Sequence, residues 1–289
     1  MVGDAMQYSK GYLEKNIKEN NFYFKKKYGQ NFITDENTIN SIVNKADIND
    51  DTLVIEIGPG AGSLTYKLAS VAKNLLCYEI DESLKSILEE NIKDYSNVEI
   101  IYDDFLKRDV VNDIKKYDYK NLYVVANLPY YVTTPIIVKI IEDKLNVDKI
   151  VVMVQKEVGD RFKATVKTKE YNSLSIFLNY YYDIKKIMDV SRHIFMPMPN
   201  VDSIVLELKR KTKKYDLLDE ALFFKLVRDS FKQKRKTIKN NLKDYNLEIV
   251  EKVLLENNLS LNSRAEEIPD YVFVSIANEL VKNDRQWLG

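Results

Sequence analysis

The chain has 289 residues, 45% of them hydrophobic, which is enough to bury the core of one large or two modest domains. Its 44 basic and 44 acidic residues cancel, so the net charge neither favours nor excludes a polyanionic partner. One cysteine, Cys77, and one histidine, His193, exclude an intramolecular disulfide and leave almost no ligands for a histidine–cysteine zinc site. We therefore expect no metal site.

The N-terminal segment mixes acidic residues with lysines and lacks the apolar stretch of a signal peptide. No apolar run in the chain approaches the roughly 20 residues that a membrane span needs. The single cysteine also fits a reducing compartment. These features predict a cytoplasmic protein with no membrane partner.

Short apolar runs alternate with segments of helical spacing in the first half of the chain. The runs, rich in Val, Ile and Tyr, predict buried strands at Leu53–Ile57, Asn74–Ile80, Val98–Tyr102, Leu122–Ala126 and Ile150–Val154. The segments between them predict helices at Ser63–Ala72, Ser83–Tyr95 and Pro135–Leu145. This alternation predicts an α/β fold with a mostly parallel sheet covered on both faces.

The pattern changes after Val154. Two further runs predict strands that bring the sheet to seven, and the second run is suited to an antiparallel edge: Leu174–Tyr182 and Ser203–Leu208. The charge run Lys209–Lys214 predicts a linker. Beyond it, helical spacing recurs without a convincing strand at Leu217–Leu226, Ile249–Asn257 and Val272–Val281. We expect an N-terminal extension at 1–23, a Rossmann-like domain at 24–210 and a small helical domain at 215–289.

Three of the eight glycines, Gly58, Gly60 and Gly62, lie close together between a predicted strand and a predicted helix. Such a loop lets the backbone turn sharply and approach a ligand. Glu79 ends the next strand, where a carboxylate typically binds the ribose hydroxyls of an adenine nucleoside. A dinucleotide loop usually has the spacing G-x-G-x-x-G. The spacing here, which starts at Glu56, is the usual methyltransferase form and favours S-adenosylmethionine as the cofactor.

The acidic segment Asp103-Asp104-Phe105 ends the third predicted strand. A carboxylate at this position can accept a hydrogen bond from the adenine amino group, while an apolar neighbour packs on the ring. The alternative is an acidic strand end that only faces solvent, and the segment by itself does not decide between the two.

The segment Asn127-Leu128-Pro129-Tyr130 follows the fourth predicted strand, at the sheet edge where ligands bind in open α/β folds. The N6 of adenine is a poor nucleophile because its lone pair is delocalised. The side-chain carbonyl of Asn127 and the backbone carbonyl of Leu128 could accept its two N–H bonds and aim the lone pair at a sulfonium methyl. Pro129 removes a competing donor, and Tyr130 offers a face on which a base can stack. A plain turn is the alternative, which the neighbouring glycine loop and Glu79 disfavour.

A second aromatic candidate is Phe195, which lies in a segment with two prolines, Ile194–Pro199. The prolines suggest a rigid loop that could hold the ring as the other wall of a base pocket. The alternative is a hydrophobic plug that only closes the core.

Basic residues gather in two segments despite the neutral total. Lys25-Lys26-Lys27-Tyr28 lies between Phe24 and Phe32, an interleaving that suits phosphates and unstacked bases. The second segment spans 228–244 and has seven basic residues against two acidic ones. Its members are Arg228, Lys232, Lys234, Arg235, Lys236, Lys239 and Lys243. A solvated helix face is the alternative, but this concentration of charge favours an RNA-binding surface.

Taken together, these residues resemble the ribosomal RNA small-subunit adenine N6-dimethyltransferase family of the KsgA type, over nearly the whole chain. The segments that carry the resemblance are Gly29–Asp35, Glu56–Gly62, Asn127–Tyr130 with Thr133–Pro135, Phe195–Ser203 and Arg264–Glu267. The resemblance implies a Rossmann-like methyltransferase domain with S-adenosylmethionine as cofactor. It places cofactor contacts at Asn31, Ile33, Gly58, Gly60, Glu79, Asp104 and Asn127. Tyr131 and Val132 stand where an Asn and an Ile or Val are common after the catalytic tyrosine, so Tyr131 departs from the family pattern.

Membership would imply two methyl groups on each of two adjacent adenosines in a terminal hairpin loop of 16S rRNA, late in small-subunit assembly. The expected partner is 16S rRNA within the 30S subunit or its precursor, and the expected oligomeric state is a monomer. The nearest alternative is a 23S rRNA adenine methyltransferase of the macrolide-resistance type, which Pro59, Leu128 and Arg264–Glu267 disfavour. A non-catalytic assembly factor and an NAD-dependent oxidoreductase are further alternatives, disfavoured by the intact motifs and by the loop spacing.

Overall fold

The computed structural model describes residues 9–212 and 215–286, within two compact units. Unit 1 comprises Met1–Gly159 and Lys185–Lys209, and unit 2 comprises Asp160–Ile184 and Arg210–Gly289. The division at 1–23, 24–210 and 215–289 that we expect from the sequence stays a prediction. Residues 1–8 of the expected N-terminal extension and 213–214 of the expected linker lie outside the described residues.

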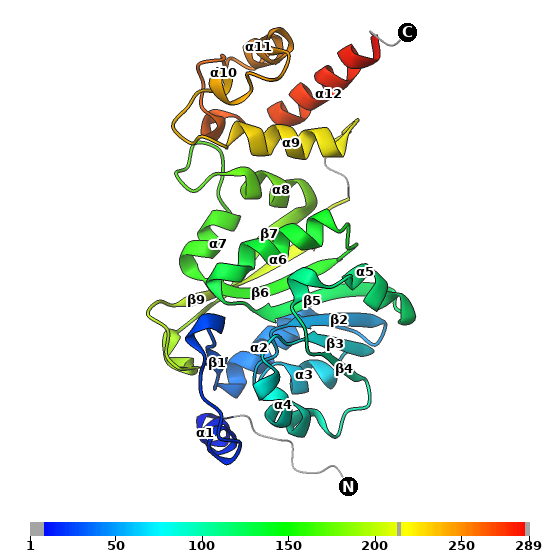
Figure 1. The fold of residues 1–289 in the computed structure, drawn as a ribbon, viewed down its shortest axis with the longest axis vertical. Helices are drawn as coiled ribbons and strands as arrows, with labels where there is room; N and C mark the ends of the chain where they lie inside the picture. The colour runs from blue at the N-terminus through cyan, green and yellow to red at the C-terminus, as the bar shows by residue number, and fades with distance from the viewer. Residues whose placement is uncertain (1–8, 213–214, 287–289) are drawn as a thin grey trace. The chain divides into compact units, whose positions relative to one another are not determined.

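The main sheet has seven strands in the order β4-β3-β2-β5-β6-β9-β7 (Figure 1). They are β2 (Thr52–Ile57), β3 (Asn74–Tyr78), β4 (Val98–Ile101), β5 (Asn121–Asn127), β6 (Lys149–Gln155), β7 (Tyr182–Val190) and β9 (Ser203–Arg210). The five strands β2 to β6 are mutually parallel, and β9 runs antiparallel to β6. This confirms the α/β class, the mostly parallel seven-stranded sheet and the antiparallel run at 203–208.

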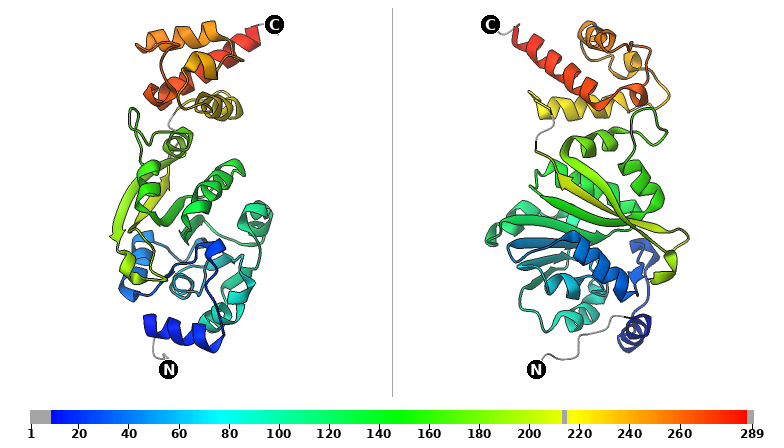
Figure 2. Two further views of the ribbon diagram at one scale, coloured as in Figure 1. Left: turned by 60° about the vertical axis from the view of Figure 1, so that its left-hand side comes forward. Right: turned by 180° about the vertical axis from the view of Figure 1, so that it is seen from behind.

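Helices cover both faces of this sheet. Unit 1 contains α1 (Lys10–Glu19), α2 (Glu36–Ala46), α3 (Thr65–Ala69), α4 (Lys85–Ile92), α5 (Val110–Asp113) and α6 (Tyr130–Glu142), and α7 (Lys156–Phe162) follows β6. Short 3-10 turns occur at η1 (Lys26–Tyr28), η2 (Glu82–Leu84), η3 (Phe105–Lys107), η4 (Ile114–Lys116) and η5 (Arg192–Ile194). Figure 1 shows α6 in front of the sheet, and the view from behind in Figure 2 shows α2 on the opposite face. A separate two-stranded ribbon pairs β1 (Phe32–Ile33) with β8 (Phe195–Met196).

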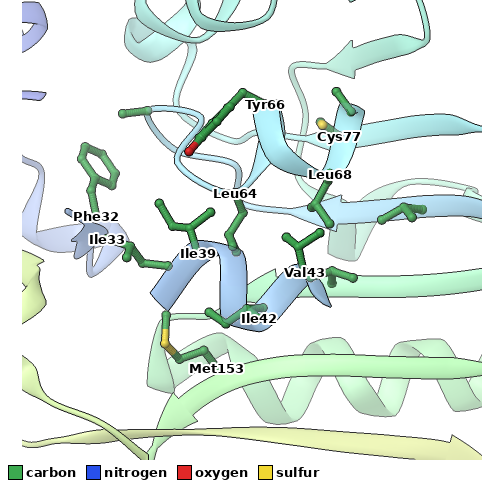
Figure 3. Close-up of a cluster of buried hydrophobic side chains, with 14 of the residues drawn as sticks. Phe32, Ile33, Ile39, Ile42, Val43, Leu64, Tyr66, Leu68, Cys77 and Met153 are labelled. Atoms are coloured by element: carbon green, nitrogen blue, oxygen red, sulfur yellow. The ribbon is translucent and has the colours of Figure 1, made fainter. Parts of the chain in front are cut away.

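The core beneath α2 shows why these segments fold together. Asp35 caps α2, since its carboxylate accepts the Thr38 N–H at 2.8 Å. The apolar stripe Ile39, Ile42 and Val43 then faces the sheet and packs with side chains of the glycine-loop helix and of β3 and β6 (Figure 3). This packing fixes the helix that follows the glycine loop against the strands that lead into the site.

Unit 2 is helical in its C-terminal part, as the sequence predicts. It contains α8 (Ser173–Tyr181), α9 (Glu220–Ser230), α10 (Ile238–Asn241), α11 (Leu247–Glu256), the turn η6 (Ala265–Glu267) and α12 (Asp270–Gln286). An aromatic cluster joins α8 to α9, with the ring centroids of Phe177 and Phe224 4.6 Å apart. The predicted helices at 217–226, 249–257 and 272–281 correspond to α9, α11 and α12.

The prediction of a strand at Leu174–Tyr182 is wrong, because residues 173–181 form α8. Asn172 caps this helix by accepting the N–H groups of Leu174 and Ser175, and the Ser175 hydroxyl accepts the Asn172 N–H in return. The apolar and aromatic run is therefore helical, and the strand, β7, begins only at Tyr182.

Candidate functional site

The ends of four parallel strands meet at one cavity in unit 1. Its empty volume is about 1010 Å³, which includes space that is open to solvent. The predicted site residues that line it are Asn31, Gly58, Gly60, Glu79, Asp104, Asn127, Leu128 and Pro129. Parallel strands bring them together because their carboxyl ends share one edge of the sheet.

The glycine loop leaves β2 in a left-handed conformation. Gly58, Gly60 and Gly62 have φ values of +70°, +62° and +84°, which side chains with a Cβ atom rarely adopt. Space also demands glycine at one of them, because a Cβ atom on Gly60 would lie 2.8 Å from Cε1 of Phe32. No atom lies within 4 Å of a Cβ built on Gly58, so the backbone there borders open space.

Glu79 is buried at the end of β3 and accepts two backbone N–H groups. Gly60 donates to Oε2 at 2.9 Å and Asp81 donates to Oε1 at 2.8 Å. Burial raises the pKa of Glu79, and the backbone hydrogen bonds partly offset this effect. A carboxylate has about four lone-pair sites, so acceptor capacity remains for ribose hydroxyls.

Glu56, the last buried carboxylate before the glycine loop, also lines the cavity. Burial raises its pKa to about 8, although the neighbouring Thr65 and Cys77 side chains oppose the shift. The Sγ atom of Cys77 lies 3.7 Å from Oε2. The sequence predicts Glu56 as part of the loop motif and does not predict this shift.

The third strand end supplies a carboxylate and apolar surface. Asp104 caps η3, because its Oδ1 accepts the Leu106 N–H at 3.0 Å. Phe105 is buried against Tyr78 with ring centroids 5.3 Å apart, and both residues line the cavity. Ile80 contributes a further apolar side chain that is 47% exposed and that the sequence prediction misses. Its place directly after Glu79 was the available signal.

Hydrogen bonds to two distant backbone carbonyls fix the start of the Asn127–Tyr130 segment. The Asn127 side-chain amide donates to the Asn31 carbonyl at 2.9 Å, and the Leu128 N–H donates to the Met153 carbonyl at 3.2 Å. Pro129 is the N-cap residue of α6, and its carbonyl accepts the Thr133 hydroxyl at 3.0 Å. The side chain of Tyr130 lies outside what the structure describes, so its stacking role stays a prediction.

Two predicted site residues, Ile33 and Phe195, lie in the hydrophobic core and do not line the cavity. They are paired across the β1–β8 ribbon, Ile33 is fully buried, and Phe195 is 6% exposed. The cofactor contact of Ile33 and the base-pocket wall at Phe195 therefore stay predictions. The ribbon nevertheless serves the site, since Asn31 and Phe32 beside it line the cavity.

The basic segments have different surroundings. Lys25 forms a salt bridge with Asp81 at 2.6 Å, so its charge is paired within unit 1. Lys27 is exposed, and its ammonium lies 4.5 Å from the centroid of the Tyr28 ring. In unit 2, all seven basic side chains in the range 228–243 are exposed. Lys234–Lys236 lie in a turn before α10 rather than in a helix.

The described residues offer neither a cluster of metal ligands nor a membrane-spanning helix. Over residues 9–212 and 215–286, no group of three or more His, Cys, Asp or Glu side chains is placed to hold a metal ion. Within the same residues, no helix is both long and apolar enough to cross a membrane.

The strand order, the glycine loop with its acidic partner and the Asn127 segment define a Rossmann-like methyltransferase fold. Solved structures of this fold superpose on most of the chain. A dimethyladenosine transferase from Plasmodium falciparum has a TM-score of 0.70 at 24% identity and covers 88% of this chain and 98% of its own. The 23S rRNA methyltransferase ErmE has a TM-score of 0.64 at 24% identity and covers 86% and 99%. At these identities the likeness concerns the fold alone.

The sequence comparisons are more specific. The family model described as "Ribosomal RNA adenine dimethylase" matches residues 21–282. A protein of Bacillus mycoides (strain KBAB4) named "Ribosomal RNA small subunit methyltransferase A" is 44% identical over 92% of this chain and 94% of its own length. A protein of Geobacillus sp. (strain WCH70) with the same name is 46% identical over 90% and 92%. The chain belongs to the ribosomal RNA adenine dimethylase family.

Proposed function

We propose that the protein transfers methyl groups from S-adenosylmethionine to N6 of two adjacent adenosines in the 3'-terminal hairpin loop of 16S rRNA. Each adenosine receives two methyl groups, late in small-subunit assembly. The enzyme works in the cytoplasm, as a monomer, on the 30S subunit or its precursor. Family membership supports the reaction. The observation that carries the proposal is the convergence of Glu79, Asp104 and a fixed Asn127 amide on one cavity.

The chemistry of the cavity fits S-adenosylmethionine. Glu79 keeps acceptor sites for the ribose hydroxyls, and Asp104 can accept a hydrogen bond from the adenine amino group. Ile80 and Phe105 supply apolar surface for the adenine ring, and the open space at Gly58 lets the loop backbone approach the ligand. When bound, the cofactor supplies an electrophilic methyl group on a sulfonium.

Asn127 orients the amine that is methylated. Its Nδ2 donates a hydrogen bond to the Asn31 carbonyl, which fixes the orientation of the amide. Its Oδ1 is the acceptor atom of the side chain and can receive an N–H of the target adenine. A carbonyl acceptor favours pyramidal geometry at N6 and aims the lone pair, which supplies positioning rather than acid–base chemistry. The amine loses its proton after transfer, so no general base is required. Flipping the adenine out of its stack costs free energy. Stacking of the flipped base on Tyr130 would offset this cost by about 1–3 kcal/mol.

The decisive experiment is mass spectrometry of rRNA after unmethylated 30S particles are incubated with enzyme and S-adenosylmethionine. We expect N6,N6-dimethyladenosine at two adjacent positions of 16S rRNA. Naked 23S rRNA serves as the competing substrate, and methylation there would instead indicate the macrolide-resistance type. Absence of cofactor binding in calorimetry would indicate a non-catalytic assembly factor.

Replacing Asn127 with Ala tests the role of the side chain. The substitution removes one hydrogen bond, worth about 1 kcal/mol, so the variant should fold. Methyl transfer should be abolished, while circular dichroism stays unchanged. Retained transfer would remove Asn127 from its role.

A further inference from the structure

Residues 24–32, which we call the strap, run along the cofactor cavity and contribute five consecutive residues, Tyr28–Phe32, to its lining. Two hydrogen bonds connect the strap to residues 127–131. Asn127 donates to the Asn31 carbonyl at 2.9 Å, and the Tyr131 hydroxyl donates to the Lys27 carbonyl at 2.9 Å. These two contacts hold the strap at only one side of the cavity.

On the other side the strap is held by the Asp81 side chain, which is 2% exposed, and by the Ser83 hydroxyl, which accepts the Lys25 ammonium at 2.7 Å. Oδ1 of Asp81 accepts the Lys25 ammonium at 2.6 Å, and its Oδ2 accepts the Gln30 amide at 2.8 Å. Gln30 in turn accepts the Lys25 backbone N–H at 2.9 Å, so the three residues form a closed network. Ser83 donates its backbone N–H and hydroxyl to Oδ1, which orients the carboxylate.

The charge state of Asp81 fits this role. Burial alone would raise the pKa of its carboxyl, but the hydrogen bonds from Lys25, Ser83 and Gln30 outweigh burial and lower it. The carboxyl is therefore ionised at neutral pH, where it can form charge-assisted bonds, which are about twice as strong as neutral ones.

Asp81 also touches the group that is proposed to hold the ribose. Its backbone N–H donates to Oε1 of Glu79 at 2.8 Å, and the other Glu79 oxygen accepts the Gly60 N–H. The side chain of Asp81 thus holds the strap, while its backbone holds Glu79. Asp81 therefore contacts both the strap and the carboxylate that is proposed to bind the ribose.

We propose that Asp81 is a positioning residue that couples closure of the strap to the grip of Glu79 on the cofactor, through Lys25 and Gln30. The inference rests on the proposed function, because it assigns the cavity to S-adenosylmethionine. Lys25 acts in this network and does not bind RNA phosphates. Opening of the Lys25–Asp81 and Gln30–Asp81 bonds releases the part of the strap between Phe24 and Phe32, whose rings stay packed in the core, and precedes release of the cofactor product.

The test compares Lys25→Met and Lys25→Arg with the wild type, using S-adenosylhomocysteine as the calorimetric probe. If Lys25→Met lowers the fraction of molecules with a closed strap, the apparent Kd rises, because it equals the intrinsic Kd divided by that fraction. We expect Kd for S-adenosylhomocysteine and KM for S-adenosylmethionine to rise about tenfold, which corresponds to about 1.4 kcal/mol. Product should dissociate faster in stopped-flow measurements, KM for 30S particles should stay the same, and Lys25→Arg should restore most of the affinity.

The matched control is Lys73→Met, which removes an ion pair with Asp118 (2.9 Å) in the same unit, from residues that do not line the cavity. It should leave both Kd and KM unchanged. Wild-type affinity in Lys25→Met, or a higher KM for 30S particles with unchanged cofactor affinity, would overturn the inference alone. Failure of the wild type to bind S-adenosylhomocysteine would instead refute the proposed function. Should Lys25→Met fold poorly, Lys25→Gln tests the same network by removing the charge opposite Asp81 at a residue that does not line the cavity.

Discussion

Alanine substitutions at Gly60 and at Gly58 separate two destabilising effects in the glycine loop, which are backbone strain and steric overlap with Phe32. Both residues have φ near +60° to +70°, so alanine costs roughly 1–2 kcal/mol of backbone strain at either position. Only at Gly60 does the added Cβ meet other atoms, at 2.8 and 3.0 Å from the Phe32 ring. That ring packs against Phe22 and Phe24, at centroid distances of 6.1 and 5.4 Å, and has little room to move. Overpacking of this kind costs about 1–3 kcal/mol.

We therefore expect Gly60→Ala to lower the free energy of unfolding by about 2–5 kcal/mol and Gly58→Ala by about 1–2 kcal/mol. Urea denaturation of the two cofactor-free variants, followed by circular dichroism, measures the difference of about 2 kcal/mol. Gly60→Ala should also weaken cofactor binding, because the Gly60 N–H supports Glu79. Equal destabilisation by the two substitutions would refute the steric argument and show that backbone strain alone requires glycine there.

Two further predictions concern charge. The folded chain raises the pKa of Glu56 from 4.5 to about 8, so it retains a proton that the unfolded chain releases, and the free energy of unfolding falls as pH rises through this interval. Glu56→Gln should remove this fall. The difference in unfolding free energy between variant and wild type should therefore change by several kcal/mol between pH 5 and pH 8, with an upper limit of about 4 kcal/mol. A constant difference would contradict the shift. Neutralising Lys234, Arg235 and Lys236 together should weaken RNA binding and flatten its dependence on salt by about two units of slope, with cofactor affinity unchanged. Undiminished RNA affinity would exclude this surface.

The sequence predicts the sheet well because its signals are local. Each parallel strand is a short apolar run in the sequence. Glu79, Asp104 and Asn127 each lie at or just after the end of such a run, so the order of the chain is enough to predict that they share one edge of the sheet. The same reasoning fails at Leu174–Tyr182, where an apolar, aromatic run fits a strand or a buried helix. Asn172 and Ser175, which form the capping box of α8, were the signal that could have decided it.

Contacts between distant segments could not be predicted in this way. Ile33 and Phe195 lie 162 positions apart in the chain and pair across an antiparallel ribbon, where both side chains are buried. Their motifs do not predict this pairing, and their roles in the site stay predictions. Lys25 looks like a free cation in a basic run, yet it meets Asp81, which lies 56 positions away. Both outcomes depend on which segments pack together, and that depends on the whole fold rather than on local pattern.

The hydrogen bond between the Asn127 amide and the Asn31 carbonyl has a consequence for which residue can occupy position 127. An aspartate would bring a carboxylate oxygen to the place of Nδ2, 2.9 Å from a backbone oxygen, with lone pairs facing lone pairs. Protonation of the carboxylate would relieve this repulsion and would tie activity to acidic conditions. The backbone of the strap therefore discriminates amide from acid at position 127, independently of any preference imposed by the base that is methylated.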